Sequence, residues 1–439
     1  MNLFQKIIDI SKGEFAKKTI LSFILKILGL VLSYVFIVIV SRYFGAEAYG
    51  RFSIAFTVLN IFALVFALGI PDATIKIVSD QTINSKFHFR KTSLRLIFIS
   101  ALVGSFILYS LSEFLSSFYK DDSLNKYFVI CAIILTPLIL LRLNYETLRG
   151  KNEIIRFGFL SHIIPFLVAS VVLLIAFYYY KIVEDSAVIV AYAFGVVIAF
   201  IFSLFWLKKD KNAQLRLKTY SARQLMHYSF PMLATSSFIF IMGWTDTLML
   251  GYYNDKADVG IYNVVIRIAR IAIIAITSIN LVLAPKISEL YSNSEFSKMR
   301  ELITKSTKLI FIVTVPLVLV IIFANKFVLS IFGEDFIVGG VALIIVMISQ
   351  LFNAISGSSG QVMNMTGNHK KLRNFTIYTA ILNITLNFIL IPLYGILGAA
   401  IATATSIIVL NLSSAIFVKR KLGIVTYFNP FHSIINRKR

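Results

Sequence analysis

Twelve apolar runs, each close to the length that crosses a bilayer, constrain this chain more than any other feature. A helix needs about 20 mostly apolar residues to span the hydrocarbon core. The runs cover residues 19–41, 52–70, 94–115, 127–147, 157–179, 187–207, 230–252, 259–283, 308–331, 338–358, 374–393 and 396–418. Only a tight turn around Leu393, Tyr394 and Gly395 separates the last two. The pattern predicts an all-α polytopic membrane protein of about twelve transmembrane helices.

Composition agrees with lipid as the main solvent of the protein. Hydrophobic residues make up 58% of the 439 residues, more than a water-soluble fold can bury. The net charge of +22 would suggest nucleic-acid binding in a soluble protein. Here the charges fall between the apolar runs, so they are topology signals, and we expect no nucleic-acid partner. The single cysteine, Cys131, excludes an intrachain disulfide and a cysteine-based metal site.

The distribution of basic residues predicts the orientation of the chain. With the N-terminus in the cytoplasm, seven lysines and arginines fall in the outer loops and four inside the spans. The remaining thirty-two of the 43 face the cytoplasm, as the positive-inside rule requires. We therefore expect both termini to be cytoplasmic.

A polar stretch near the middle divides the chain into two halves. We expect an interfacial N-terminal segment, a six-helix bundle, a basic cytoplasmic linker, a second six-helix bundle and a basic cytoplasmic tail. These cover residues 1–18, 19–207, 208–229, 230–418 and 419–439. Two parallel halves with a substrate path between them are a recurring transporter plan. The sequence thus predicts two bundles around a central cavity.

Ionisable residues inside the spans are the best pointers to function, because each is costly in lipid unless paired or hydrated. Arg267 and Arg270 lie deep in one run and share a helix face with Asn263. Asp246 in the preceding run should lie at similar depth. We expect Asp246 to pair with Arg267, which leaves Arg270 to line the substrate path. The alternative role of Asp246 is ion coupling.

Two further cations lie nearer the predicted cytoplasmic side. Lys26 either faces the cavity or snorkels to the headgroups. Arg142, with Glu146 four residues on and Arg149 beyond it, either contributes to the cavity or forms a self-paired helix end. Glu146 itself serves either in structural pairing or in ion coupling. Asp72 and Lys76 form another expected interfacial pair. The surplus of cations favours an anionic substrate group such as a phosphate or pyrophosphate.

Signals of enzymatic chemistry are scarce. The sequence contains no Walker A loop, and its five histidines are scattered without metal-ligand spacing. All predicted outer loops are short, whereas a membrane-embedded glycosyltransferase or polymerase would typically carry a large one. That class therefore remains the weakest alternative, and we expect neither a catalytic residue nor a bound metal.

Three segments resemble a known family. They are "SRYFGAEAYGRFSIAFTVLNIFALVFALGIPDATIKIVSD", "FPMLATSSFIFIMGWTDTLMLGYYNDKADVGIYNVVIRIARI" and "GSSGQVMNMTGNHKKLRNFTIYTAILNITLNFILIPLYGILGAAIATATS". They look like bacterial polysaccharide-biosynthesis proteins, the Wzx-type repeat-unit flippases of the multidrug/oligosaccharidyl-lipid/polysaccharide exporter superfamily. The resemblance implies a MATE-like fold whose two six-helix bundles open alternately to each side.

The resemblance also implies a substrate and a location. A flippase of this type would move an undecaprenyl-diphosphate-linked oligosaccharide from the cytoplasmic to the periplasmic leaflet of the bacterial inner membrane, coupled to a proton or sodium gradient. Members often have a cationic lumen, which Arg270, Arg267 and Lys26 would supply. The polysaccharide polymerase and chain-length machinery are the implied partners. A drug:cation antiporter of the same superfamily is the alternative, although no deep acid occurs in the first three runs.

Overall fold

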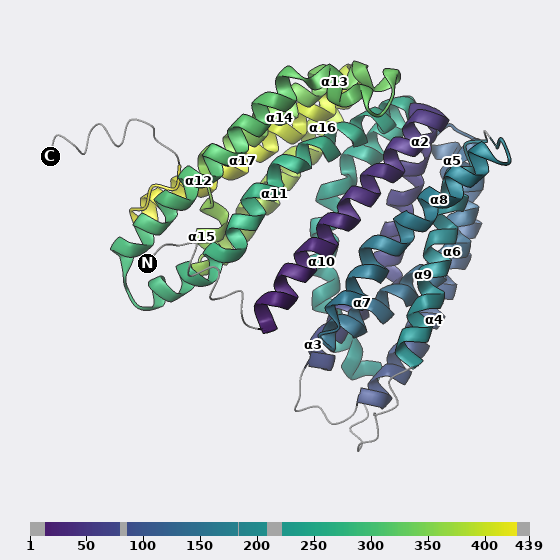
Figure 1. Ribbon diagram of the computed structural model, residues 1–439, viewed down its shortest axis with the longest axis horizontal. Helices are drawn as coiled ribbons and strands as arrows, with labels where there is room; N and C mark the ends of the chain where they lie inside the picture. Colours follow the sequence, from purple (N-terminus) through teal and green to yellow (C-terminus); the bar gives the residue numbers. More distant parts are fainter. Residues whose placement is uncertain (1–13, 80–85, 183, 209–221, 428–439) are drawn as a thin grey trace. The chain divides into compact units, whose positions relative to one another are not determined.

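The computed structural model describes residues 14–79, 86–182, 184–208 and 222–427, and these are almost entirely helical (Figure 1). No strand occurs within these ranges. Residues 1–13 of the predicted N-terminal segment, part of the central linker and the end of the basic tail lie outside them. The predicted all-α class is confirmed.

The chain forms two compact units, Met1–Trp244 and Thr245–Arg439. The boundary falls inside helix α10 (Ala222–Tyr253), whereas the sequence predicted a division at residues 208–229. The start of α10 packs in unit 1. A Cβ on Gly69 would lie 2.4 Å from the Ser229 carbonyl oxygen, so glycine permits this close approach. Gly69 also has a positive φ of 67°, which favours glycine in a turn.

Unit 1 is built around helix α6, which contacts helices α2 to α5, α7 and α9. The helices of unit 1 before α10 are α2 (Glu14–Phe66), α3 (Ile70–Ser79), α4 (Lys86–Ser110), α5 (Ser112–Phe118), α6 (Ser123–Gly150), α7 (Ile154–Gly158), the π-helix η1 (Phe159–Ile163), α8 (Ile164–Tyr178) and α9 (Ala187–Lys208). Helices α8 and α9 lie against each other, because Gly195 has no side chain; a Cβ there would lie only 2.2 Å from the Pro165 carbonyl oxygen.

Helix α2 contains the first two predicted spans. It runs for 53 residues and departs from helical geometry at Gly45, with φ 86° and ψ 174°. A side chain at this φ would be strained, so glycine suits the kink. The sequence predicted a loop over residues 42–51, and the structure has a single kinked residue there instead.

Unit 2 is organised by α11, which contacts α12, α14, α15 and α17. Its helices after α10 are α11 (Lys256–Ser292), α12 (Phe296–Phe323), α13 (Asn325–Ser330), the 3-10 helix η2 (Glu334–Gly339), α14 (Gly340–Ser356), α15 (Ser359–Met365), α16 (His369–Tyr394) and α17 (Ile396–Leu422). The predicted tight turn between the last two spans is confirmed: Gly395 alone joins α16 to α17, with φ 53°. A Cβ on Gly398 would lie 2.2 Å from the Leu390 carbonyl oxygen, so glycine is required for this close packing.

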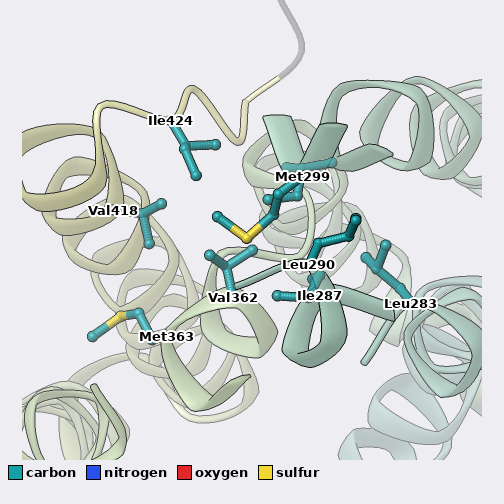
Figure 2. Close-up of a cluster of buried hydrophobic side chains, with 9 residues drawn as sticks. Leu283, Ile287, Leu290, Met299, Val362, Met363, Val418 and Ile424 are labelled. Carbon is teal, nitrogen blue, oxygen red and sulfur yellow. The ribbon is translucent and has the colours of Figure 1, made fainter. Parts of the chain in front are cut away.

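A cluster of buried apolar side chains packs several segments of unit 2 together (Figure 2). It joins α11, α12, α15, α17 and the segment after α17, through Leu283, Ile287, Leu290, Met299, Ile303, Val362, Met363, Val418 and Ile424. Burying each such side chain contributes roughly 1.5–3 kcal/mol. The Thr307 hydroxyl also donates to the Thr426 carbonyl at 2.9 Å. The segment that follows α17 is thereby fixed against the bundle.

The membrane assignment follows from length and composition. Within the described residues, ten helices are long and apolar enough to cross a membrane. The first, Leu21–Phe66, covers two predicted runs, and α10 covers the predicted run 230–252. The structure is therefore consistent with twelve spans, and the protein is a multi-pass membrane protein.

Candidate functional site

The carboxylate of Asp246 is buried in unit 2 and held by uncharged side chains from three other helices. Asp246, on α10, is 9% exposed. Its Oδ2 accepts hydrogen bonds from the hydroxyls of Tyr262 on α11 and Thr403 on α17, both at 2.7 Å. Its Oδ1 accepts one from the Nδ2 amide of Asn387 on α16. We call these four residues the Asp246 cage.

The predicted ion pair between Asp246 and Arg267 is wrong. All three donors to Asp246 are uncharged, and no ion pair of this carboxylate occurs in the described part of the chain. The reason is helix register. The turn between α10 and α11 is only two residues long, so Asp246 lies opposite Tyr262. Arg267 is five residues farther along α11, about 7 Å beyond at 1.5 Å per residue.

The cage holds one polar atom that the protein leaves unsatisfied. Asn387 is fully buried, and its Nδ2 donates both to Asp246 and, at 3.1 Å, to the Oδ1 of Asn383. An ionised carboxylate only accepts hydrogen bonds, so the Asn387 amide nitrogen must face Asp246. Its Oδ1 then has no hydrogen-bond partner among the described residues. A buried negative charge beside a spare oxygen can accept a proton or bind a small cation.

The cage is not a conventional metal site of clustered acids, cysteines or histidines. Within the described ranges, no three such side chains are grouped to hold a metal ion. Its oxygens come from one carboxylate, one amide and two hydroxyls, a set that suits a hard cation better than a transition metal.

A polar stripe runs along the face of α11 that unit 2 covers least. Asn263 and Arg267 are half-buried and Arg270 is exposed, whereas Tyr262, Ile268 and their neighbours on the opposite face are buried. The stripe begins at the Asp246 cage, because the hydroxyl of Thr247 donates to Asn263 Oδ1 at 3.3 Å. The structure thus confirms that Asn263, Arg267 and Arg270 share one helix face.

The remaining predicted cations lie in unit 1, in different settings. Lys26, on α2, is exposed. The Nη2 of Arg142 lies 3.6 Å from Asp72 Oδ1 on α3, so its partner is on another helix. Glu146 pairs with Arg149, at 3.4 Å. The expected pairing within the helix end therefore occurs between Glu146 and Arg149, whereas Arg142 pairs with Asp72, because the short helix α3 packs on α6. The side chain of Lys76 lies outside the described residues.

Sequence reasoning missed an ionic cluster in unit 1. Arg51 donates from Nε to Asp121 at 2.7 Å, from Nη1 to Asp185 at 2.6 Å and from Nη2 to Glu47 at 2.5 Å. We call these four residues the Arg51 cluster. It joins the middle of α2 to the loops before α6 and before α9. The signal in the sequence was the coincidence of one arginine and three acids in loops predicted to lie on the same side.

A second pair extends the Arg51 cluster toward water. Lys126 donates to Glu184 at 2.8 Å, and both side chains are exposed. This hydrogen bond from the ammonium group lowers the pKa of the Glu184 carboxyl. The buried Tyr127 hydroxyl donates to the Asp185 carbonyl at 2.7 Å. The loops before α6 and α9 are therefore fixed by both charged and neutral contacts.

Comparison with known families and proteins gives a consistent picture. The family described as polysaccharide biosynthesis protein matches residues 15–291, and the family described as MatE matches residues 231–389. The chain is 25% identical over 405 residues to the "Probable low-salt glycan biosynthesis flippase Agl15" of Haloferax volcanii. That match covers 90% of this chain and 81% of the relative.

Two solved structures share the fold over almost their whole length. One is an inward-facing multidrug resistance MATE family transporter of the MOP superfamily, with a TM-score of 0.73 at 14% identity, covering 90% of this chain and 94% of that one. The other is the lipid II flippase MurJ in an inward closed conformation, with a TM-score of 0.72 at 18% identity, covering 92% and 87%. The predicted MATE-like architecture is confirmed.

Proposed function

Because this chain belongs to the polysaccharide biosynthesis protein family, we propose that it flips a lipid-linked glycan from one leaflet of the membrane to the other. The observation that carries the proposal is the α11 stripe, which places two arginines on the least covered face of an otherwise apolar membrane helix. Such residues are costly against lipid and mark a hydrated path. The name of the Haloferax relative, a glycan biosynthesis flippase, supports the same class of substrate.

The substrate group that we assign to the stripe is the diphosphate of the carrier lipid. Arg267 and Arg270 are separated by one helical turn, so two guanidinium groups can engage neighbouring phosphates. Guanidinium binds phosphate oxygens in pairs, which suits a group that must be held and then released. The carrier is undecaprenyl diphosphate, and the glycan moves from the cytoplasmic to the outer leaflet of the cytoplasmic membrane. Lys26 and Arg142 are secondary contacts for the same charge.

Asp246 couples transport to a proton or sodium gradient. The partners of this buried carboxylate are all neutral, so no counter-charge compensates it, and loading a proton or a cation changes the electrostatics of four helices at once. The cage and the stripe meet at Thr247 and Asn263. Loading the cage can therefore change how α11 presents its arginines.

The orientation that we propose has both termini in the cytoplasm. A C-terminal alkaline phosphatase fusion should be inactive, and a fusion to a cytoplasmic reporter should be active. An active phosphatase fusion would contradict the even number of spans. The polysaccharide polymerase and chain-length machinery are the proposed partners, since they would act on the flipped product.

Disruption of the gene separates the three candidate functions. Loss of a flippase removes the surface glycan and accumulates its lipid-linked precursor. Loss of a drug:cation antiporter leaves the glycan intact and raises susceptibility to cationic dyes. A membrane-embedded glycosyltransferase would extend a lipid-linked acceptor when purified. An intact glycan without accumulated precursor would overturn the flippase proposal.

The arginine stripe is tested by complementation of that disruption. Arg270→Ala should abolish transport in folded protein, because it removes the charge that meets the diphosphate. Arg270→Lys should restore part of the activity, since lysine keeps the charge but lacks the planar fork. The matched control is Arg373→Ala, an exposed arginine at the start of α16. Full complementation by a well-expressed Arg270→Ala would overturn the assignment of the stripe.

A further inference from the structure

A groove with a volume of about 350 Å³ lies within unit 1, separate from the cage and the stripe. It is formed by α4, α6 and α9, which contact one another through α6 (Figure 1). Its lining is Leu94, Arg95, Phe98, Leu140, Asn144, Phe200 and Leu204. Five of these seven side chains are apolar, and the volume is in the lower part of the range for ligand sites.

The two polar members of the lining lie at the same end of the groove, beside Leu94 and Leu204. Arg95 precedes Phe98 on α4, which runs away from the predicted cytoplasmic side, and Asn144 follows Leu140 on α6, which runs toward it. Arg95 and Asn144 therefore lie nearer that side, and Phe98 and Leu140 lie deeper, by about 5 Å. Both polar side chains thus lie toward the headgroups and only apolar side chains lie deeper, an arrangement that can accommodate a lipid molecule.

Arg95 supplies a positive charge at the polar end. It is exposed, and within the described part of the chain no acidic side chain pairs with it. The other polar side chain of the lining, Asn144, already has a hydrogen-bond partner. Its Nδ2 donates to the Ser203 hydroxyl at 2.8 Å, and both residues are buried. The guanidinium group is thus the one charged feature of this groove that can meet an anion.

The surface around the groove is typical of contact with lipid. Large apolar side chains project outward next to it, including Phe98, Ile99 and Leu102 on α4 and Phe202 and Phe205 on α9, each 47–64% exposed. Bulky exposed apolar side chains without charged neighbours face lipid in a membrane protein. The occupant of the groove must therefore carry a hydrocarbon chain.

We propose that this groove binds an anionic phospholipid, with an acyl chain along Phe98, Leu140 and Phe200 and its phosphate at Arg95. A single cation matches the one charge of a phosphodiester. The carrier diphosphate bears more charge and is better matched by the two arginines of the α11 stripe. The groove is therefore a second lipid site, distinct from the proposed substrate path.

Lipid binding to the purified full-length protein tests this proposal without any transport assay. Native mass spectrometry titrations with dioleoyl phosphatidylglycerol and dioleoyl phosphatidylcholine should show tighter binding of the anionic lipid. Arg95→Gln should raise the Kd for phosphatidylglycerol about fivefold, from the loss of one cation near the membrane surface. The matched control is Lys91→Gln, which removes an exposed charge one turn away that does not line the groove. It should leave the Kd close to that of the wild type.

A second variant tests the groove itself and keeps Arg95. Leu204→Trp narrows the groove from its exposed rim and should weaken binding of both lipids. Equal effects of Arg95→Gln and Lys91→Gln would mean nonspecific surface attraction and would overturn the site, as would wild-type binding by Leu204→Trp. If undecaprenyl diphosphate displaces phosphatidylglycerol at lower concentration and Arg95→Gln abolishes this, the groove belongs to the carrier and the phospholipid assignment is wrong. None of these outcomes depends on whether the protein is a flippase.

Discussion

The Asp246 cage and the Arg51 cluster each place one charged side chain among three partners, but the partners are neutral in the first and charged in the second. Arg51 meets three carboxylates and is 17% exposed, near loops that reach water. Asp246 meets two hydroxyls and an amide, and lies inside the helix bundle. In the Arg51 cluster each carboxylate pairs directly with an opposite charge, whereas in the Asp246 cage only neutral donors surround the carboxylate.

This difference distinguishes the Arg51 cluster, whose ion pairs are structural, from Asp246, whose charge can take part in transport. Compensated charges stabilise a fixed arrangement of chain segments, and breaking one partner leaves the others unpaired. A charge solvated by neutral dipoles can still gain a proton or an ion, because nothing in its surroundings has neutralised it. We therefore expect mutations of the two sites to separate stability from transport.

The largest effect should come from Asp246→Asn. The amide has the same size and can still hydrogen-bond to Tyr262 and Thr403, so the protein should fold. Transport should fall to background because the side chain can no longer carry charge. Glycan complementation, together with size-exclusion profiles of the purified variant, measures both quantities.

The matched change in the Arg51 cluster is Asp185→Asn, which should leave transport near the wild-type level. If both asparagine variants transport normally, the comparison between the sites fails and Asp246 is structural. If Asp246→Asn does not fold, Asp246→Glu keeps the charge and its transport decides the question.

The second effect, smaller for transport but large for stability, is that of Arg51→Ala. It leaves Glu47, Asp121 and Asp185 without their shared partner. We expect a loss of about 2–3 kcal/mol, below the range for a fully buried pair because these side chains are partly exposed. Thermal unfolding in detergent measures the change, and the fraction that stays folded should still transport.

Two controls sharpen this prediction. Arg51→Lys should recover part of the stability, since one ammonium group cannot reproduce three directed hydrogen bonds. Lys126→Ala breaks the exposed pair with Glu184 and should leave the melting temperature unchanged. A destabilisation by Lys126→Ala equal to that of Arg51→Ala would show that burial does not distinguish the two pairs.

The architecture was predictable because hydropathy and charge asymmetry are local signals. The apolar runs located the helices, and Gly395 located the last hairpin. The kink at Gly45 was not predictable, since no proline marks it and the helix continues on both sides.

The sequence singled out the charged residues of the candidate site but not their partners. Asp246, Arg267 and Arg270 stood out as charges in apolar runs, yet the partner of Asp246 depended on a two-residue turn whose position the pattern leaves uncertain. Asn387 and Thr403 come from helices more than 140 residues away, and polar residues of this kind are common in membrane helices. Only the packing of α16 and α17 on α10 and α11 could identify them.

The smallest expected effect is that of replacing a buried tyrosine with phenylalanine, once at each site. Tyr262 donates to the Asp246 carboxylate, and Tyr127 donates to the backbone carbonyl of Asp185. Each change to phenylalanine removes one hydrogen bond and should cost about 1 kcal/mol in stability. Tyr262→Phe should also change the dependence of transport on external pH or sodium, because it removes one of three donors that solvate the charged carboxylate. Tyr127→Phe should leave that dependence unchanged, since its hydroxyl touches no group that is loaded or released. Transport assays across a pH series at fixed sodium, and a sodium series at fixed pH, identify the coupling ion by which series shifts. Identical profiles for the two variants would mean that the cage hydroxyls stabilise the bundle without tuning the charge.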